Sequence, residues 1–250
     1  MEPFYIKNIK FSAQTIIEKR LVVRNLLIKK SKNINSGEIV RILNDDVAVL
    51  FDLYDTYFLD DYFKKYFRGT LLFSLSTRMT YAAGKTIVLK NLGALKIEDE
   101  KYEIRMGVNF FLAYNEIEGE KNVSGIQTKD ALEAFQIVFE HELCHLIEFY
   151  LFKASSCKQD RFKTLANNIF GHTGIYHSLP TKKEIARKKY DLHVGEHIIF
   201  DYQNKKLSGF IHGIKKRATV MVLDKKGSYA DKKGNRYMKY YVPLEALKKK

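Results

Sequence analysis

The sequence has few of the residues that cross-link or interrupt a chain. Its 250 residues include two cysteines, three prolines and no tryptophan. A secreted disulfide scaffold would carry more cysteines, so we expect free thiols and a reducing, cytoplasmic compartment. Three prolines exclude a proline-rich linker.

Long uncharged apolar runs are also missing. None approaches the ~20 residues that a membrane span requires, and the first residues lack the apolar segment of a signal peptide. We therefore expect no membrane partner. Hydrophobic residues nevertheless make up 46% of the chain, which is enough for a sizeable core.

The charge is unevenly distributed along the chain. Residues 181–250 hold 19 of the 43 Lys and Arg residues and 7 of the 29 acidic ones, a net charge of +12. The preceding 180 residues hold 24 against 22 and are nearly neutral. This asymmetry predicts a polyanionic partner for the C-terminal part, DNA or RNA, and the alternative is a solvated basic surface.

Periodicity in the first 180 residues predicts a mixed α+β domain. Helical spacing covers residues 13–30, 44–57 and 60–66, and β-branched and aromatic residues at 70–81, 86–90 and 102–113 predict a small antiparallel sheet. Asp130, with Glu133 three residues later, predicts the start of a buried helix that continues to about 152. A shorter helix is expected at 160–170, stopped by Gly171.

The basic C-terminal part has a different pattern. Residues 183–190 have the composition of a charged connector. Strand-like runs follow at 197–202, 207–214, 218–223 and 237–242, with turn residues between them, which predicts a small β-barrel. We therefore expect two domains, 1–182 and 183–250.

The most informative stretch is the pattern His-Glu-x-x-His, which runs from His141 to His145 within the long helix. At about 100° per residue, His145 lies about 40° around the helix from His141, and Glu142 about 100°. Both imidazoles can then reach one zinc ion, with Glu142 beside them to take a proton from water. The alternative is a pair of hydrogen-bonded helix histidines, but two buried imidazoles and a carboxylate without a partner would be costly.

A catalytic zinc usually has a third protein ligand. We favour Cys157, which follows His145 by twelve residues and precedes the next helix, so that it can fold back towards the motif. His172 and His177 are the competitors, and Cys157 and His172 are not expected at the same ion. Cys144 is expected to pack beside the site without binding.

These residues resemble the SprT-like zinc metallopeptidases, a family that includes the Spartan proteases. The resemblance covers roughly residues 45–178. Its motifs are the stretches 66–69, 76–79 and 83–86, the strand-like 102–106, and the stretches 162–166 and 170–173, in that order. It implies a zincin-like domain that hydrolyses peptide bonds. An ungapped match places Lys158 at the family's third histidine ligand, and the neighbouring Cys157 takes that role here.

The C-terminal part resembles small basic barrels of the KOW or Tudor type, through residues 194–200 and 207–211. Such barrels bind nucleic acid or proteins. Lys215, Lys216 and Arg217 are the candidate phosphate-binding residues. Nearby tyrosines at 229, 237, 240 and 241 could stack on bases, but we expect them to build the barrel core.

Together these patterns predict a zinc-dependent peptidase. His141, His145 and Cys157 would hold the metal and Glu142 would be the general base. A strand before the metal helix, at 102–106, could pair with an extended protein substrate. By analogy with Spartan, that substrate could be a protein bound to nucleic acid. The alternatives are a nucleic-acid-binding or adaptor protein with a purely structural zinc, and a metal-dependent hydrolase of a non-peptide bond.

Overall fold

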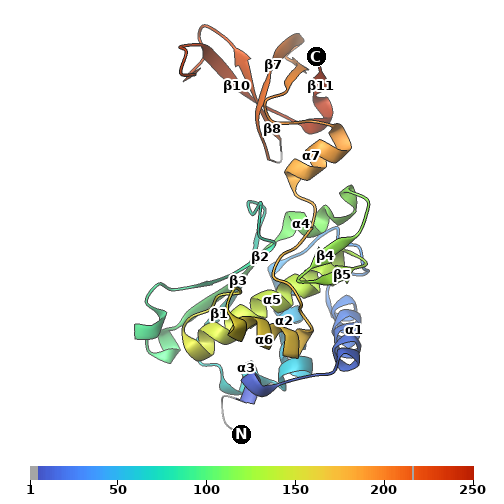
Figure 1. Ribbon diagram of the computed structural model, residues 1–250, viewed down its shortest axis with the longest axis vertical. Helices are drawn as coiled ribbons and strands as arrows, with labels where there is room; N and C mark the ends of the chain where they lie inside the picture. Colours follow the sequence, from blue (N-terminus) through green and yellow to red (C-terminus); the bar gives the residue numbers. More distant parts are fainter. Residues whose placement is uncertain (1–4, 216) are drawn as a thin grey trace. The chain divides into compact units, whose positions relative to one another are not determined.

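The structure is a computed structural model that describes residues 5–215 and 217–250. The chain divides into two compact units, Met1–Leu179 and Pro180–Lys250, where the sequence predicted 1–182 and 183–250. Each unit has its own hydrophobic core. The α+β class is therefore confirmed, with helices and a small sheet in the first unit and a mostly β second unit (Figure 1).

The first unit contains six α-helices among the described residues. They are α1 (Ala13–Lys30), α2 (Asn44–Leu59), α3 (Tyr62–Tyr66), α4 (Val108–Leu112), α5 (Ala131–Phe152) and α6 (Asp160–Phe170). The predicted start of α5 is confirmed, because the Asp130 side chain accepts a hydrogen bond from the Glu133 amide at 2.9 Å. The predicted stop is confirmed too, since Gly171 ends α6 in the left-handed conformation at φ 71°.

The sheet of the first unit has three strands, β1 (Thr70–Ser76), β2 (Gly84–Val88) and β3 (Lys101–Gly107), in the order β1-β3-β2. β2 pairs antiparallel with β3, but β1 pairs parallel with it, so the prediction of an antiparallel sheet is wrong for that pair. The cause is topological: β3 inserts between β1 and β2, which would otherwise form an adjacent pair. The predicted third strand also ends early, because residues from Val108 onward form α4.

A second, smaller sheet was not predicted. β4 (Lys121–Val123) and β5 (Ile126–Thr128) form a hairpin. Its two turn residues, Ser124 and Gly125, both have positive φ, at 51° and 83°. This is the geometry of the tight turns that join antiparallel strands, and the Ser-Gly pair was the available signal.

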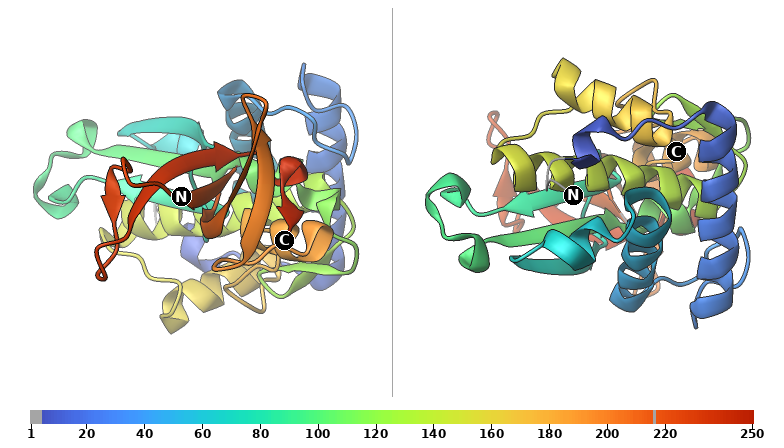
Figure 2. Two further views of the ribbon diagram at one scale, coloured as in Figure 1. Left: turned by 90° about the horizontal axis from the view of Figure 1, so that it is seen from above. Right: turned by 90° about the horizontal axis from the view of Figure 1, so that it is seen from below.

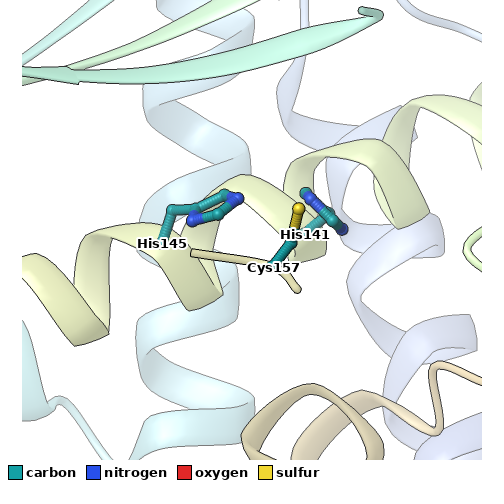
Figure 3. A group of neighbouring side chains, drawn as sticks. All are labelled: His141, His145 and Cys157. Atoms are coloured by element: carbon teal, nitrogen blue, oxygen red, sulfur yellow. The ribbon is translucent and has the colours of Figure 1, made fainter. Parts of the chain in front are cut away.

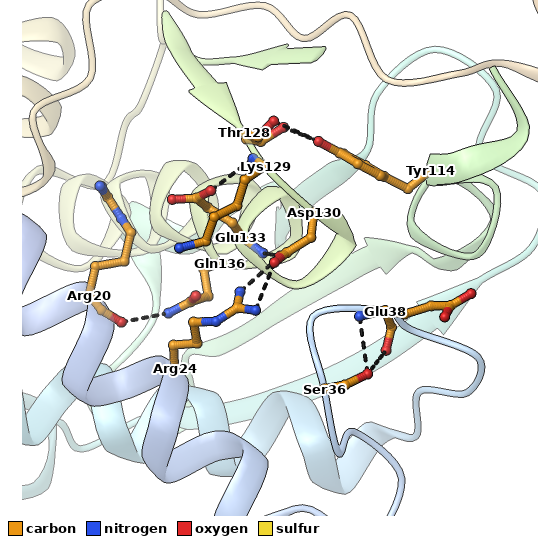
Figure 4. A network of polar contacts seen from close by, with 10 residues as sticks. All are labelled: Arg20, Arg24, Ser36, Glu38, Tyr114, Thr128, Lys129, Asp130, Glu133 and Gln136. Atoms are coloured by element: carbon orange, nitrogen blue, oxygen red, sulfur yellow. Dashed lines mark hydrogen bonds and ion pairs between the residues drawn. The ribbon is translucent and has the colours of Figure 1, made fainter. Parts of the chain in front are cut away.

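α5 is the central element of the first unit. It lies between α6 and the three-stranded sheet, and it also contacts α1 (Figure 2). The helix is apolar around most of its circumference, as expected for a helix covered on all sides. Polar contacts join its first turns to α1: Arg24 forms a two-pronged ion pair with Asp130, and the Gln136 amide donates to the backbone oxygen of Arg20 (Figure 4).

A buried ionic network fixes α5 deeper in the core. Both oxygens of the fully buried Glu140 accept hydrogen bonds from Arg20 at 2.8 Å. Tyr54 donates to the same carboxylate at 2.6 Å, and His172 Nε2 lies 2.9 Å from it. Burial by itself would raise the pKa of Glu140, but the Arg20 charge and the hydrogen bonds from His172 and Arg20 outweigh it and lower this pKa to about 2.

The second unit begins with a helix where a connector was predicted. α7 (Lys182–Tyr190) is capped by Thr181 and Glu184, whose side chains each bond the other's backbone amide. Thr181 and Glu184 have the spacing of a capping box in the sequence, but the high charge of the segment led us to predict a connector. Ala186 of α7 is buried in the core of this unit, so the segment is part of the domain.

The strands of the second unit form one antiparallel sheet. They are β6 (His197–Tyr202), β7 (Lys205–Ile214), β8 (Ala218–Leu223), β9 (Tyr229–Ala230), β10 (Arg236–Val242) and β11 (Lys248–Lys249). Their order is β11-β6-β7-β8-β10-β9, and over the described residues this row does not close into a ring of paired strands. The four predicted strands are confirmed at nearly their predicted positions.

The remaining regular segments are short 3₁₀ turns. They are η1 (Tyr5–Asn8), η2 (Leu92–Ala94), η3 (Ile97–Asp99), η4 (Tyr114–Glu116) and η5 (Leu244–Ala246). Among the described residues, no helix has both the length and the apolar character needed to cross a bilayer.

The Glu140 network predicts a specific pH dependence of stability. The pKa of Glu140 is about 2 in the folded chain and 4.5 when unperturbed, so its stabilising contribution is present above pH 4.5 and is lost as the pH falls towards 2. The difference in unfolding free energy between wild type and Glu140→Gln should shrink by about 2 kcal/mol from pH 5 to pH 3. Urea unfolding in the presence of a chelator, monitored by circular dichroism, measures this difference at each pH. A difference that stays constant over this range would contradict the charged network.

Candidate metal centre

The helical spacing of the motif places both imidazoles on one side of α5. The ring centroids of His141 and His145 are 5.0 Å apart. Phe162 of α6 packs against both rings, at 4.9 and 4.4 Å between centroids. The pair is therefore held between two helices, with its rings aligned by packing.

Cys157 lies on the loop that returns from α5 to α6. Lys153 ends α5 in the left-handed conformation, and the chain then reverses. One ligand-type atom each from His141, His145 and Cys157 lies within 4.8 Å of the others. Figure 3 shows the sulfur of Cys157 between the two imidazole rings. The predicted three residues thus meet in space.

The competing histidines have other contacts. His172 is buried, and its Nε2 lies 2.9 Å from Glu140 Oε2. His177 forms a β-bridge with Val123, its Nδ1 accepts from the Leu179 amide, and its ring packs on Phe110. Neither belongs to the three-residue group that the described part of the chain forms. Cys144 is buried in the core, and burial raises its thiol pKa well above the usual value.

A hydrogen-bonded chain behind His145 was not predicted from the sequence. Ser155 Oγ lies 2.6 Å from His145 Nδ1 and donates to Glu148 Oε2 at 2.6 Å. Arg161 pairs with the other oxygen of this fully buried carboxylate at 2.6 Å and also donates to the backbone oxygen of Ala154. These hydrogen bonds orient His145 through Nδ1 and anchor the loop that carries Cys157. A serine in the loop and an arginine in the first turn of α6 give no sequence signal of such a role.

Both imidazoles are in an environment that favours their neutral form. Burial, with smaller contributions from His145, His172 and His177, lowers the pKa of His141 to about 3. Burial lowers the pKa of His145 to about 4, against the opposing charge of Glu148. His141 Nδ1 is buried and has no hydrogen-bond partner among the described residues.

Glu142 is buried beside the histidines, at the edge of the sheet. Thr86 Oγ lies 2.9 Å from Glu142 Oε2 and 2.9 Å from the Glu142 backbone oxygen. Burial raises the pKa of Glu142 to about 7, although the Thr86 contacts and the charge of Lys85 oppose the shift. This carboxylate can therefore hold or release a proton near neutral pH.

A cleft of about 540 Å³ opens onto these groups. Its floor includes His141, Glu142, His145 and Cys157. Gly84, Lys85 and Thr86 of β2 also line it, and so do Val123, Ser124 and residues 175–177. The site thus has room for a ligand beside the strand β2.

The expected substrate-pairing strand at 102–106 is not available for that role. It forms β3, which is hydrogen-bonded to β1 on one side and β2 on the other. A central strand has no free edge. β1 and β2 are the two edge strands of this sheet, and β2 is the one that lines the cleft.

The residues predicted to bind nucleic acid lie at the turn between β7 and β8. Lys215 and Arg217 are exposed there, and Lys216 lies outside the described residues. The expectation that the tyrosines build the core is wrong for three of them. Tyr229 and Tyr241 are 43% and 63% exposed, and Tyr237 is not among the residues packed against the core. Tyr240 does pack against the core.

Comparisons with known proteins give no relative for this chain: no family model, no curated protein and no solved structure matches it.

The close approach of β2 to Glu142 predicts the effect of one added methyl group. A Cβ at Gly84 would lie 2.6 Å from Glu142 Cγ, 2.7 Å from its Oε1 and 2.9 Å from Val138 Cγ1. Gly84→Ala should destabilise the first unit by about 1–3 kcal/mol, because both neighbours are confined. Gly93→Ala is the control: its Cβ would meet Lys153 Cβ at an ordinary 3.8 Å and should change stability by less than about 0.5 kcal/mol. Equal unfolding free energies for the two variants would contradict the described packing.

Proposed function

We propose that the chain is a zinc-dependent peptidase whose first unit is zincin-like. One observation carries the proposal: two imidazoles and a thiol converge at the floor of a cleft that also contains a buried carboxylate. His141 and His145 come from one helix and Cys157 from the following loop, so the donor set depends on the tertiary fold.

The donor set fits zinc. Imidazole nitrogen and thiolate sulfur are zinc's usual protein ligands, and three of them leave a fourth position for water or substrate. The described residues offer no hydrogen-bond partner to the buried Nδ1 of His141, so this nitrogen is free for a metal ion. The hydrogen bond that orients His145 is expected of a metal-binding histidine. The cleft borders all three residues, so the fourth position would face open space.

When bound, zinc would acidify a coordinated water and polarise a carbonyl group. The residues of the chain would then move the proton. Glu142 would accept it from the attacking water and deliver it to the leaving amine. Thr86, hydrogen-bonded to Oε2, would keep the carboxylate of Glu142 turned towards the cleft.

The edge strand supports a polypeptide as substrate. β2 pairs on one side with β3 and on the other with no strand of the described residues, and it lines the cleft next to Glu142. An extended peptide can add to such an edge through main-chain hydrogen bonds, which places its own carbonyl groups over the floor. This favours peptide bonds over other hydrolysable bonds.

The resemblance to SprT-like peptidases is compatible with this architecture, and the basic second unit would tether the enzyme to nucleic acid. The substrate would then be a protein associated with DNA or RNA. The rival function, a structural zinc in a binding protein, requires four protein ligands. His172, which the sequence analysis named as a competing ligand, is instead bonded to Glu140.

Replacing the proposed base tests catalysis directly. Glu142→Gln should lower the rate of cleavage of an unfolded protein substrate by at least about 100-fold while zinc content stays unchanged, because Gln cannot accept the proton. Glu133→Gln, on the same helix, is the matched control, since Gln also serves at its capping position. Glu142→Gln cleaving at the wild-type rate, or wild type with no activity, would refute the peptidase assignment.

The hydrogen bonds from His145 through Ser155 to Glu148 predict an effect on metal affinity. Ser155→Ala removes the hydrogen bond to Nδ1 and one anchor of the Cys157 loop, so zinc affinity should fall about 10–100-fold in a competition titration. Ser156→Ala, one residue further along the same loop, should leave the affinity unchanged. Equal affinities for the two variants would show that this chain does not orient the ligands.

A further inference from the structure

The sheet of the second unit has two chemically different faces. In an antiparallel sheet, residues directly opposite one another project to the same side. Ile198, Phe200, Ile211, Val220 and Val242 are all buried in the core of this unit and define its inner face.

The outer face carries aromatic and apolar side chains that are not buried in that core. In the strand register, Phe210 lies opposite Met221, Met221 opposite Lys239, Leu223 opposite Tyr237, and Tyr237 opposite Tyr229. Tyr241 is on the same side, two residues beyond Lys239. We call this set the outer aromatic face: Phe210, Met221, Leu223, Tyr229, Tyr237, Lys239 and Tyr241.

The rings of this face are held in defined positions. Phe210 and Tyr237 meet edge to face at 5.5 Å between centroids, and the Tyr237 hydroxyl donates to Asp231. The Lys239 ammonium lies 3.8 Å from the Tyr229 ring centroid, which keeps this charge on the face. Leu223 and Tyr241 remain 68% and 63% exposed. Met221 is buried, at 7% exposure, so the accessible part of the face consists of the aromatic rings, Leu223 and the Lys239 ammonium.

Positive charge borders this face. The two turns flanking β9 carry Lys225, Lys226, Lys232 and Lys233, all exposed, and Arg236 follows directly. The only acidic residues in this stretch are Asp224 and Asp231. Their carboxylates accept backbone hydrogen bonds within the turns, from Lys226 and from Lys233 and Asn235. The border of the face is therefore strongly cationic.

We propose that the outer aromatic face binds single-stranded nucleic acid. Unpaired bases would stack on Tyr241, Tyr237 and Phe210, and Lys239 with the turn lysines would contact the phosphates. A duplex cannot use this surface in the same way, because its base faces are already stacked on one another. The proposal refines the nucleic-acid tether of the proposed function and moves its centre from the β7–β8 turn, with Lys215 and Arg217, to the sheet itself.

The test uses the full chain and a fluorescein-labelled dT12 oligonucleotide, followed by fluorescence anisotropy. Tyr241→Ala should weaken binding about 10-fold, since stacking of one base on an aromatic ring is lost. Tyr241→Phe should retain most of the affinity because the ring remains. Tyr202→Ala, an exposed tyrosine of the same sheet that packs on Tyr240, should have no effect.

Salt dependence separates stacking from phosphate contacts. The paired change Lys225→Ala with Lys226→Ala should flatten the slope of log affinity against log salt, whereas Tyr241→Ala should leave that slope unchanged. A 12-base-pair duplex should compete more weakly than unlabelled dT12. Wild-type affinity in Tyr241→Ala, equal competition by the duplex, or binding of an acidic peptide in place of dT12 would overturn the proposal.

These outcomes are independent of the metal site. Zinc content and the effect of Glu142→Gln should be the same in Tyr241→Ala as in wild type. Loss of the peptidase assignment would therefore leave the oligonucleotide result standing, and failure of oligonucleotide binding would leave the peptidase assignment standing.

Discussion

The structure depends on the hydrogen-bond and ion-pair partners that the carboxylates of one buried helix find. α5 carries Glu140, Glu142 and Glu148, and all three are buried. A buried carboxylate without a partner is costly, so each needs a local solution. Glu140 pairs with Arg20, and Glu148 pairs with Arg161. Glu142 instead accepts a hydrogen bond from the neutral hydroxyl of Thr86.

Because their partners differ, the three residues contribute to the structure in different ways. Two arginines, from α1 and α6, fix the helix against its neighbours through their ion pairs with Glu140 and Glu148. Glu142 has no such ion pair among the described residues, and it lies at the cleft. Of these three buried carboxylates, it is the one whose proton can change without breaking a buried ion pair, as the proposed role of general base requires.

The loop after α5 shows how the same helix builds the rest of the site. Glu148 receives Ser155 and Arg161, and Arg161 in turn binds the backbone at Ala154. These contacts on both sides of the return place Cys157 between the two imidazoles. The proposed ligand set is thus a consequence of helix burial, because Arg161, the ion-pair partner of Glu148, also anchors the loop of the proposed third ligand.

Local signals in the sequence predicted the local parts of this structure. The Asp130 cap, the His141–His145 spacing and the Gly171 stop are all readable within one or two helical turns, and the return of Cys157 followed from its distance along the chain. Pairing of β1 with β3 was not readable, because β3 is inserted from 25 residues further along the sequence and the alternation of side chains does not encode direction.

Other features were not predicted correctly, for different physical reasons. The charge of residues 182–190 outweighed the Thr181–Glu184 capping box in our interpretation, and α7 was missed. For Tyr229, Tyr237 and Tyr241 we expected burial in the core, but their register on β9 and β10 turns them outward. The Ser155–Glu148–Arg161 chain depends on three side chains that meet only after the loop has folded.

The most direct test of the central claim is zinc X-ray absorption on the metal-loaded full chain. The account predicts one bound zinc with a single sulfur neighbour at about 2.3 Å, two imidazole nitrogens at about 2.0–2.1 Å and one further light atom that is not a protein ligand. A spectrum without sulfur, or with a third imidazole, would contradict it, and so would a preparation that takes up no stoichiometric zinc.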